Sequence, residues 1–484
     1  MSGDLPDRAL VVGAARSGVA AAGALAARGV AVVLHDAAAD VRPPVAEGVA
    51  LALGAHDPAA LAGAADVLVT MQALASHFGL VQPEIDVTFT SLSMSCQSDP
   101  ERPPLVAIRQ VKQRDIDYED LTQVDHLVQH VLADQINLTE ARRWLARIVS
   151  SGHQTPRGAI TIGWGVMCAS VALQLGGSWT VLAIAFVSAV CIDRLQLVMS
   201  RRRLPFFYQQ IAGGAVATLL AVAVDAAGLT IDTSLVVTAN IIMLLAGIGF
   251  MGALQDALSG FYITANARLL EAVLATAGII AGVSVGLSVA DLGGVDVGIL
   301  VPGRAGWEGV TVTAIGSALA ASAFAFASYA PKRVLLPIAA ISGVAMVIFQ
   351  GVESQGFDRP WAAGIASFFV GLVSFAVAGR VRVPPLVVVV SAVVPMLPGL
   401  SIYRGLSLLA EGGSGTSPGL LAMITAVSVS ISLAAGVILG EYVAQPVKRE
   451  ARRMESRLAG PRLVGPSRIR HGRKRRPEPG SSDS

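Results

Sequence analysis

Long uncharged apolar runs, which begin near residue 157, constrain the fold of this chain more than any other feature. About 20 helical residues cross the roughly 30 Å of hydrocarbon in a bilayer. Helices are the expected form of such runs, because lipid offers the backbone no hydrogen-bond partner. The first run holds two spans around a Gly-Gly-Ser turn, so the sequence predicts an all-α polytopic membrane protein with ten transmembrane helices. The runs are Gly158–Ile192, Leu204–Val224, Thr233–Gln255, Ala272–Ala290, Gly309–Pro331, Val334–Val352, Pro360–Gly379, Val383–Tyr403 and Gly412–Gly440.

The composition agrees with a membrane protein. Of the 484 residues, 53% are hydrophobic and only 14% are charged, whereas soluble domains have about 25% charged residues. The three cysteines, Cys96, Cys168 and Cys191, have neither disulfide nor metal-ligand spacing. We therefore predict no metal and no cofactor.

The distribution of basic residues predicts the orientation. Cytoplasmic loops of membrane proteins are rich in Lys and Arg. If residue 157 starts inside, the inner loops hold Arg194, Arg201, Arg202, Arg203, Arg268, Lys332, Arg333, Arg380 and Arg382. The outer loops then hold only Arg304, Arg359 and Arg404. This bias predicts a multi-pass protein of the cell membrane with both termini in the cytoplasm.

The ten spans divide into two sets of five, within residues 157–292 and 307–445. Because five is odd, two halves of like fold would lie in opposite orientations. Inverted repeats of this kind are common in secondary transporters, which bind substrate at the midplane between the halves. Residues 446–484 are basic and contain several prolines, so they predict a disordered cytoplasmic tail rather than a nucleic-acid-binding domain.

A small α+β domain is predicted over residues 71–156. Ile85, Val87 and Phe89 alternate as in a strand, and Pro104–Val111 is a second candidate strand. Apolar residues then recur at helical spacing from residue 121 to 132. Asn137 and Glu140 form a capping-box pattern that opens a further helix.

Residues 1–70 predict a partial Rossmann-like α/β fragment. Ala9–Val12 and Val30–Leu34 are predicted strands on either side of an Ala-rich helix. Gly13 and Gly18 allow a tight turn before that helix, and Asp36 follows the second strand. These three residues form at most a vestigial nucleotide site, because the fragment is incomplete.

One stretch of the membrane region is specific enough to suggest a family. Residues 249–272, GFMGALQDALSGFYITANARLLEA, resemble the signature of the threonine/serine exporter family, and Val394–Leu400 fits its second half. The resemblance covers roughly residues 71–445. It implies a transporter, not an enzyme, that exports threonine and serine with the proton motive force. Split relatives are linked to dicarboxylates, which leaves a succinate-type exporter open. A homo-oligomer is compatible with the sequence.

Residues 1–70 resemble another family, the Mur ligases that add D-glutamate to UDP-N-acetylmuramoyl-alanine. The likeness rests on Val11–Gly18 and Ala64–Thr70. The ATP-binding and C-terminal domains of a ligase have no counterpart, so a membrane-anchored nucleotide-binding enzyme is the weaker hypothesis. A membrane scaffold without transport is a third.

Two segments are candidates for the transport site. Ionisable groups at membrane depth are functional candidates by default, and Asp256, Arg268 and Glu271 lie at span ends. They either lie at the cytoplasmic interface, with Glu271 as the partner of Arg268, or belong to a polar re-entrant or broken-helix segment, Asp256–Glu271, that reaches toward the midplane. The small or polar residues of that segment are Ser259, Gly260, Thr264 and Asn266.

The second candidate segment is in the ninth span. Pro395 and Pro398-Gly399 are expected to break the helix, because proline removes a backbone donor. A break frees N–H groups for a substrate carboxylate and carbonyls for an ammonium group. Tyr403 and Arg404 follow it. A dicarboxylate would instead need two cations, such as Arg268 with Arg404.

Overall fold

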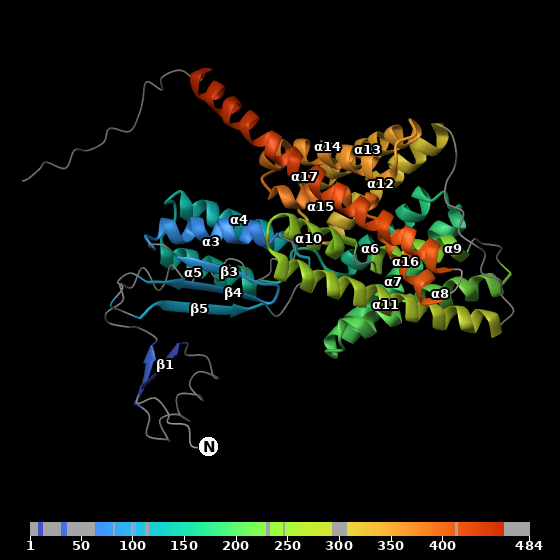
Figure 1. Cartoon of the computed structure of the whole chain (residues 1–484), viewed down its shortest axis with the longest axis horizontal. Coiled ribbons are helices and arrows are strands. Elements are labelled where there is room, and N and C mark those ends of the chain that lie inside the picture. Colours follow the sequence, from blue (N-terminus) through green and yellow to red (C-terminus); the bar gives the residue numbers. More distant parts are fainter. Residues whose placement is uncertain are drawn as a thin grey trace, which may run out of the picture.

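The computed structural model describes residues 8–12, 31–35, 63–80, 83–97, 101, 103–111, 116–228, 233–244, 247–292, 307–411 and 415–458. Within this part, the chain is mostly helical and forms two regions (Figure 1). A small α+β unit lies beside one end of a larger helical bundle. The first two strands, β1 (Arg8–Val12) and β2 (Ala31–His35), pair in parallel.

The strands β1 and β2 coincide with the strands expected near the N-terminus. Gly13, Gly18 and Asp36 lie outside the described residues. The Rossmann-like fragment therefore stays a prediction.

The α+β unit consists of α3 (Ala64–His77), β3 (Glu84–Val87), β4 (Ser91–Cys96), β5 (Leu105–Gln110), α4 (Tyr118–Leu132) and α5 (Leu138–Ser150). The strands form an antiparallel sheet in the order β3-β4-β5. The predicted strands and helices are confirmed in β3, β5, α4 and α5, and the predicted capping box is present at Asn137 and Glu140. The sequence reasoning did not predict β4.

The predicted domain boundary between residues 70 and 71 falls inside helix α3. Val67 before the boundary and Met71 and Leu74 after it are buried in the same core as α4 and the sheet. Because one apolar face runs through the whole helix, α3 packs with the α+β unit and not with a separate fragment.

The bundle contains α6 to α17. Its helices are α6 (Arg157–Gln174), α7 (Trp179–Arg201), α8 (Phe206–Ala226), α9 (Thr233–Leu244), α10 (Gly247–Leu258), α11 (Tyr262–Leu292), α12 (Trp307–Ala327), α13 (Lys332–Ser354), α14 (Arg359–Val381), α15 (Pro385–Val393), the 3₁₀ helix η1 (Val394–Met396), α16 (Gly399–Glu411) and α17 (Thr416–Leu458). Seven helices in the described part are long and apolar enough to cross a membrane, or eight if α9 and α10 count as one bent span. The protein is thus a polytopic membrane protein.

Two of the membrane segments are broken. Helices α9 and α10 meet at a bend of 44°. Helix α15 ends at Val393, and α16 begins only at Gly399, after η1 and the Leu397-Pro398 pair. The break that the prolines predict in this segment is confirmed.

Helix pairings recur along the bundle. Helix α8 packs most extensively with α11, and α14 packs most extensively with α17. Likewise, α6 packs with α7 and α9, and α12 packs with α13 and α15. Glycines allow the closest crossings: a Cβ at Gly282 would lie 2.0 Å from the carbonyl oxygen of Ile211, and one at Gly371 would lie 2.4 Å from that of Val437.

Several contacts join the α+β unit to the bundle in the described part of the chain. The amide of Tyr118 donates to the carbonyl of Ser328 at 2.9 Å, just after α12. A ring nitrogen of His126 lies 3.1 Å from the carbonyl oxygen of Arg382, after α14. The hydroxyl of Thr264, near the start of α11, donates to the carbonyl of Val87 at 3.3 Å. The unit therefore lies across the ends of several bundle helices.

Candidate functional site

A cavity of about 430 Å³ lies between the bundle helices. We call it the bundle cavity. Sites for small molecules usually have about 300–1,000 Å³ and an apolar lining with a few polar groups. The polar and charged lining residues include Gln174, Gln196, Gln210, Arg268, Glu271 and Arg359, and the broken segment contributes Pro395 and Gly399.

Residues of α6 and α8 line the bundle cavity together with residues at the break between α15 and α16. The side-chain amide of Gln174, the last residue of α6, donates to the carbonyl of Pro395 at 3.4 Å. Gln210 on α8 is only 2% exposed, and its amide oxygen has no hydrogen-bond partner among the described residues. The cavity thus contains polar groups that a ligand could engage.

A buried ion pair lies beside the bundle cavity. Asp256 on α10 is 1% exposed, and its Oδ2 lies 3.2 Å from Nε of Arg268 on α11. Its Oδ1 accepts a hydrogen bond from the amide of Ala64, at the start of α3, at 2.9 Å. The guanidinium of Arg268 also lies 5.9 Å from the ring centre of Phe89. Removing one partner of such a pair leaves an uncompensated buried charge, which is strongly destabilising.

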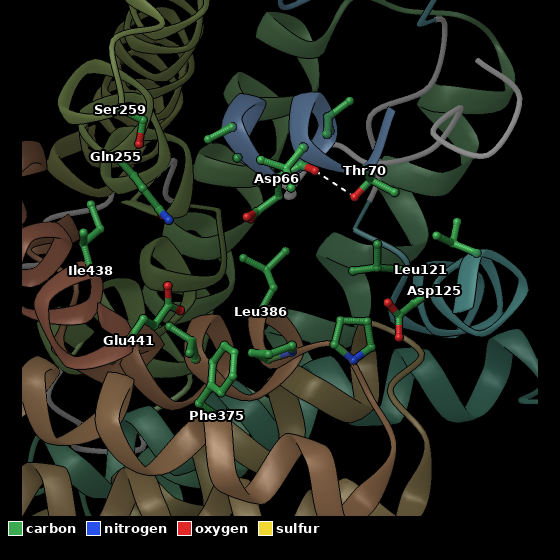
Figure 2. A pocket seen from close by; sticks show the side chains of 18 of the residues that line it. Asp66, Thr70, Leu121, Asp125, Gln255, Ser259, Phe375, Leu386, Ile438 and Glu441 are labelled. Atoms are coloured by element: carbon green, nitrogen blue, oxygen red, sulfur yellow. Dashed lines mark hydrogen bonds between the residues drawn. The ribbon is translucent and has the colours of Figure 1, made fainter. Parts of the chain in front are cut away.

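A second cavity, of about 520 Å³, lies where the α+β unit meets the bundle; we call it the junction cavity. Figure 2 shows side chains from α3, α4, α10, α14, α15 and α17 around it. Asp66, Asp125 and Glu441 supply three carboxylates, and no Lys or Arg is among its described lining residues. Burial, and secondly the charge of Asp256, raises the pKa of Asp66 above its ordinary value.

Helix α10 contributes residues to both cavities. Gln255 and Ser259, at its end, line the junction cavity, whereas Ile248 and Gly249, at its start, line the bundle cavity. Asp256 lines neither cavity, but it lies near Gly63, which lines the junction cavity, and pairs with Arg268, which lines the bundle cavity. The ion pair therefore lies next to residues of both cavities.

The structure brings some of the predicted site residues together and not others. Arg268, Glu271, Pro395 and Gly399 line the bundle cavity, and Ser259 lines the junction cavity. The remaining predicted residues line neither cavity: Asp256, Thr264 and Pro398 are buried, Gly260, Asn266 and Arg404 are exposed, and Tyr403 is half-buried.

The interpretation of Asp256–Glu271 as a re-entrant or broken-helix segment stays a prediction, and the segment is interrupted between α10 and α11. Helix α10 ends at Leu258, Gly260 takes a φ of +91° and α11 starts at Tyr262, so a tight turn joins the two helices. Thr264 binds the α+β unit there, which fixes the turn at the end of the bundle. Another break in the helix path lies earlier in the chain, at the bend between α9 and α10.

Sequence reasoning missed Gln174, Gln210 and Trp164, which line the bundle cavity. A single amide in an apolar run is a weak signal, because only the packing shows whether it faces lipid, protein or a cavity. The two glutamines nevertheless lie within or beside predicted spans, and polar residues in such runs usually face the bundle interior.

One group of side chains in the described part has the spacing of metal ligands. Single ligand atoms of Asp117, Asp120 and His153 lie within 4.8 Å of one another. Asp117 caps α4 through the amide of Asp120, and His153 pairs with Asp117 at 3.2 Å and stacks on Tyr329. These contacts account for the arrangement without an ion. Burial, with the charge of Asp117 next, raises the pKa of Asp120 to about 6.

The apolar helices and their breaks define a multi-pass membrane protein with a cavity between its helices. A family model described as a putative threonine/serine exporter matches residues 59–290. A second model, described as a threonine/serine exporter, matches residues 313–443. The chain belongs to the threonine/serine exporter family.

Two curated relatives agree with this assignment. A probable threonine/serine exporter of Mycobacterium tuberculosis is 32% identical over 430 residues, which cover 87% of this chain and 80% of the relative. A threonine/serine exporter of Corynebacterium glutamicum is 32% identical over 399 residues, which cover 80% of each. No solved structure matches this chain. The family is one of transporters, and these comparisons give no support to the Mur-ligase likeness of residues 1–70.

Proposed function

We propose that this protein exports threonine and serine from the cytoplasm, coupled to the proton motive force. The observation that carries the proposal is the bundle cavity, which has the size of a small-molecule site and is lined by groups of both charges. The printed names of the relatives supply the substrate class.

The charges of the cavity favour a zwitterion over a dicarboxylate. Arg268 suits a carboxylate and Glu271 suits an ammonium group, and both line the bundle cavity. Arg359 also lines it, but it lies 3.6 Å from Glu353, while Arg268 lies 3.2 Å from Asp256. Two arginines balanced by acidic partners leave no surplus of positive charge for a dianion. Arg404, the second cation that a dicarboxylate site was expected to use, is not among the cavity residues.

The proposal includes ten spans in two inverted halves, 157–292 and 307–445. The recurrence of helix pairings supports it: α8 with α11 corresponds to α14 with α17, and each half has its break in the fourth segment. The first helices of the halves, α6 and α12, are antiparallel. Gly163 near the start of α6 lies against Ala327 at the end of α12, and Gly316 of α12 lies against Gln174 at the end of α6.

The contacts of the α+β unit support the proposed orientation. It touches the bundle near Thr264, Ser328 and Arg382, which all lie beside loops that the positive-inside rule assigns to the cytoplasm. The C-terminal part of α17 extends on the same side (Figure 1). We accordingly propose that the unit and both termini lie in the cytoplasm.

In this mechanism, the two halves alternate access around the bundle cavity. An amino acid enters from the junction cavity, and the Asp256–Arg268 pair, which lies next to residues of both cavities, opens to admit it. Asp256 or Glu271 takes up a proton during the cycle. The carbonyls and amides at the break between α15 and α16 complete the site for the zwitterion.

Efflux of labelled threonine from proteoliposomes, with unlabelled serine and succinate as competitors, tests the substrate class. We expect serine, but not succinate, to reduce labelled threonine efflux. Movement of labelled succinate without threonine efflux would assign the protein to the dicarboxylate branch, and flux of neither would contradict a transport function for these substrates.

A further inference from the structure

Gln210 has a buried side-chain amide with a hydrogen-bond position that a ligand in the bundle cavity could occupy. It lies on α8, is 2% exposed and lines the bundle cavity, and its amide oxygen has no hydrogen-bond partner among the described residues. A buried polar atom without a partner costs free energy and needs a specific explanation. The neighbouring Gln209 differs: it is only half-buried, lines neither cavity, and donates its NH2 group to the carbonyl of Leu204 at 2.8 Å.

Gln210 lies against α11 at a position farther along that helix than Arg268 and Glu271. Gly278 of α11 lies opposite: a Cβ there would approach the Cβ of Gln210 to 3.1 Å. Glu271 lies two helical turns earlier on α11, which is about 10 Å along the helix axis. Arg268 lies one further turn toward the α+β unit.

The chemistry of a carboxamide matches one group of the proposed substrates. A primary amide both donates and accepts hydrogen bonds, and so does a hydroxyl. An ammonium group only donates, a carboxylate only accepts, and the bundle cavity has Glu271 and Arg268 for these two groups. The neutral amide is left for the hydroxyl that threonine and serine share.

We infer that Gln210 determines substrate specificity by binding the side-chain hydroxyl of the exported amino acid. This inference rests on the proposed function. Valine has nearly the shape of threonine without its hydroxyl, and alanine is the corresponding analogue of serine. A site that hydrogen-bonds a hydroxyl rejects the analogue that lacks it, so the wild type should prefer threonine over valine by about tenfold or more.

The test compares labelled threonine and labelled valine efflux from proteoliposomes containing wild type, Gln210→Met or Gln209→Met. Methionine keeps the length of glutamine but has no amide. We expect Gln210→Met to lower the threonine-to-valine ratio to within about threefold of unity. Gln209→Met, one residue away and outside the cavity lining, should keep the wild-type ratio.

The outcomes separate this inference from the proposed function. If the wild type moves neither threonine nor serine, the proposed function fails. If it moves threonine but Gln210→Met keeps the wild-type ratio, only the role of Gln210 fails. If Gln210→Met does not fold, the wild-type threonine-to-valine ratio still tests the inference. Equal efflux of threonine and valine by the wild type would overturn it.

Discussion

At the scale of single residues, Asp256 connects three parts of the molecule. Its carboxylate binds the guanidinium of Arg268 on α11 and the backbone amide of Ala64 on α3. It is almost fully buried, so water cannot replace either partner. The state of this one side chain therefore affects the contact between α10, α11 and the α+β unit.

We predict that Asp256→Asn abolishes proton-coupled threonine efflux although the protein still inserts into the membrane. Asparagine carries no charge, so the variant cannot exchange a proton at this position and leaves Arg268 without its carboxylate partner. Removing one partner of a buried pair costs about 3–5 kcal/mol, so its thermal unfolding midpoint should also fall. Efflux with and without an imposed pH gradient, on equal amounts of inserted protein, measures the effect. Normal coupled efflux would exclude Asp256 as the coupling residue.

We predict that Asp120 makes stability depend on pH. Its pKa rises on folding from 3.8 to about 6, so the folded state binds more protons than the unfolded state in that range. The free energy of unfolding should therefore fall as pH rises from about 4 to about 6 and stay lower above it. Asp120→Asn should remove this part of the fall, measured by thermal unfolding across that range. Asp86→Asn, at an exposed position on β3, is the control; identical pH profiles for wild type and Asp120→Asn would contradict the prediction.

At the scale of elements, the closest helix crossings depend on glycine. Lipid gives helices no hydrophobic reason to associate with one another, so close van der Waals packing of small residues has a large share in holding them together. The pairs α8–α11 and α14–α17 meet at such positions. A methyl group added there would meet backbone atoms of the neighbouring helix, which cannot move aside as a flexible side chain can.

We predict that Gly282→Ala destabilises the protein by about 1–3 kcal/mol, the usual cost of overpacking. Its Cβ would lie 2.0 Å from the carbonyl oxygen of Ile211, so α8 and α11 would have to separate. Gly351→Ala in α13 is the matched control, since no atom lies within 4 Å of its added Cβ. Alanine is the better helix former, so Gly351→Ala should be neutral or slightly stabilising. Thermal unfolding in detergent compares them, and equal midpoints for the two variants would contradict the account.

The elements were largely predictable because their signals are local. Uncharged runs gave the membrane helices, the Asn137–Glu140 pattern gave the start of α5, and the prolines gave the break before α16. The bend between α9 and α10 contains no proline, so composition gave no sign of it. Helix α3 was missed because Ala64–Thr70 was assigned to a different likeness, although its apolar face continues to Leu74.

The candidate site was less predictable, because it depends on contacts between distant residues. The sequence singled out Arg268, Glu271 and Pro395, which share one cavity. It could not show that Asp256 binds the amide of Ala64, 192 positions away, or that Gln210 faces protein rather than lipid. Charged residues and prolines are recognisable as exceptional in an apolar run. Whether a glutamine there faces lipid, protein or a cavity is shown only by the packing of the helices.

At the scale of the whole molecule, the proposed orientation makes the loops alternate between the two sides of the membrane. In a cysteine-free background, single cysteines at Gly177 and Gln355 should react with an impermeant maleimide from outside. Cysteines at Arg202 and Tyr329 should react only after the membrane is permeabilised. A reversed pattern at Gln355 and Tyr329 would contradict the inverted second half while leaving the first half intact.

Threonine efflux driven by an imposed proton gradient tests the central claim most directly. Purified wild-type protein in proteoliposomes loaded with labelled threonine should release it faster when a pH gradient is imposed, and the acceleration should disappear when a protonophore collapses the gradient. Threonine efflux that is indifferent to the gradient would contradict proton coupling. No threonine efflux under either condition would contradict the proposed export function itself.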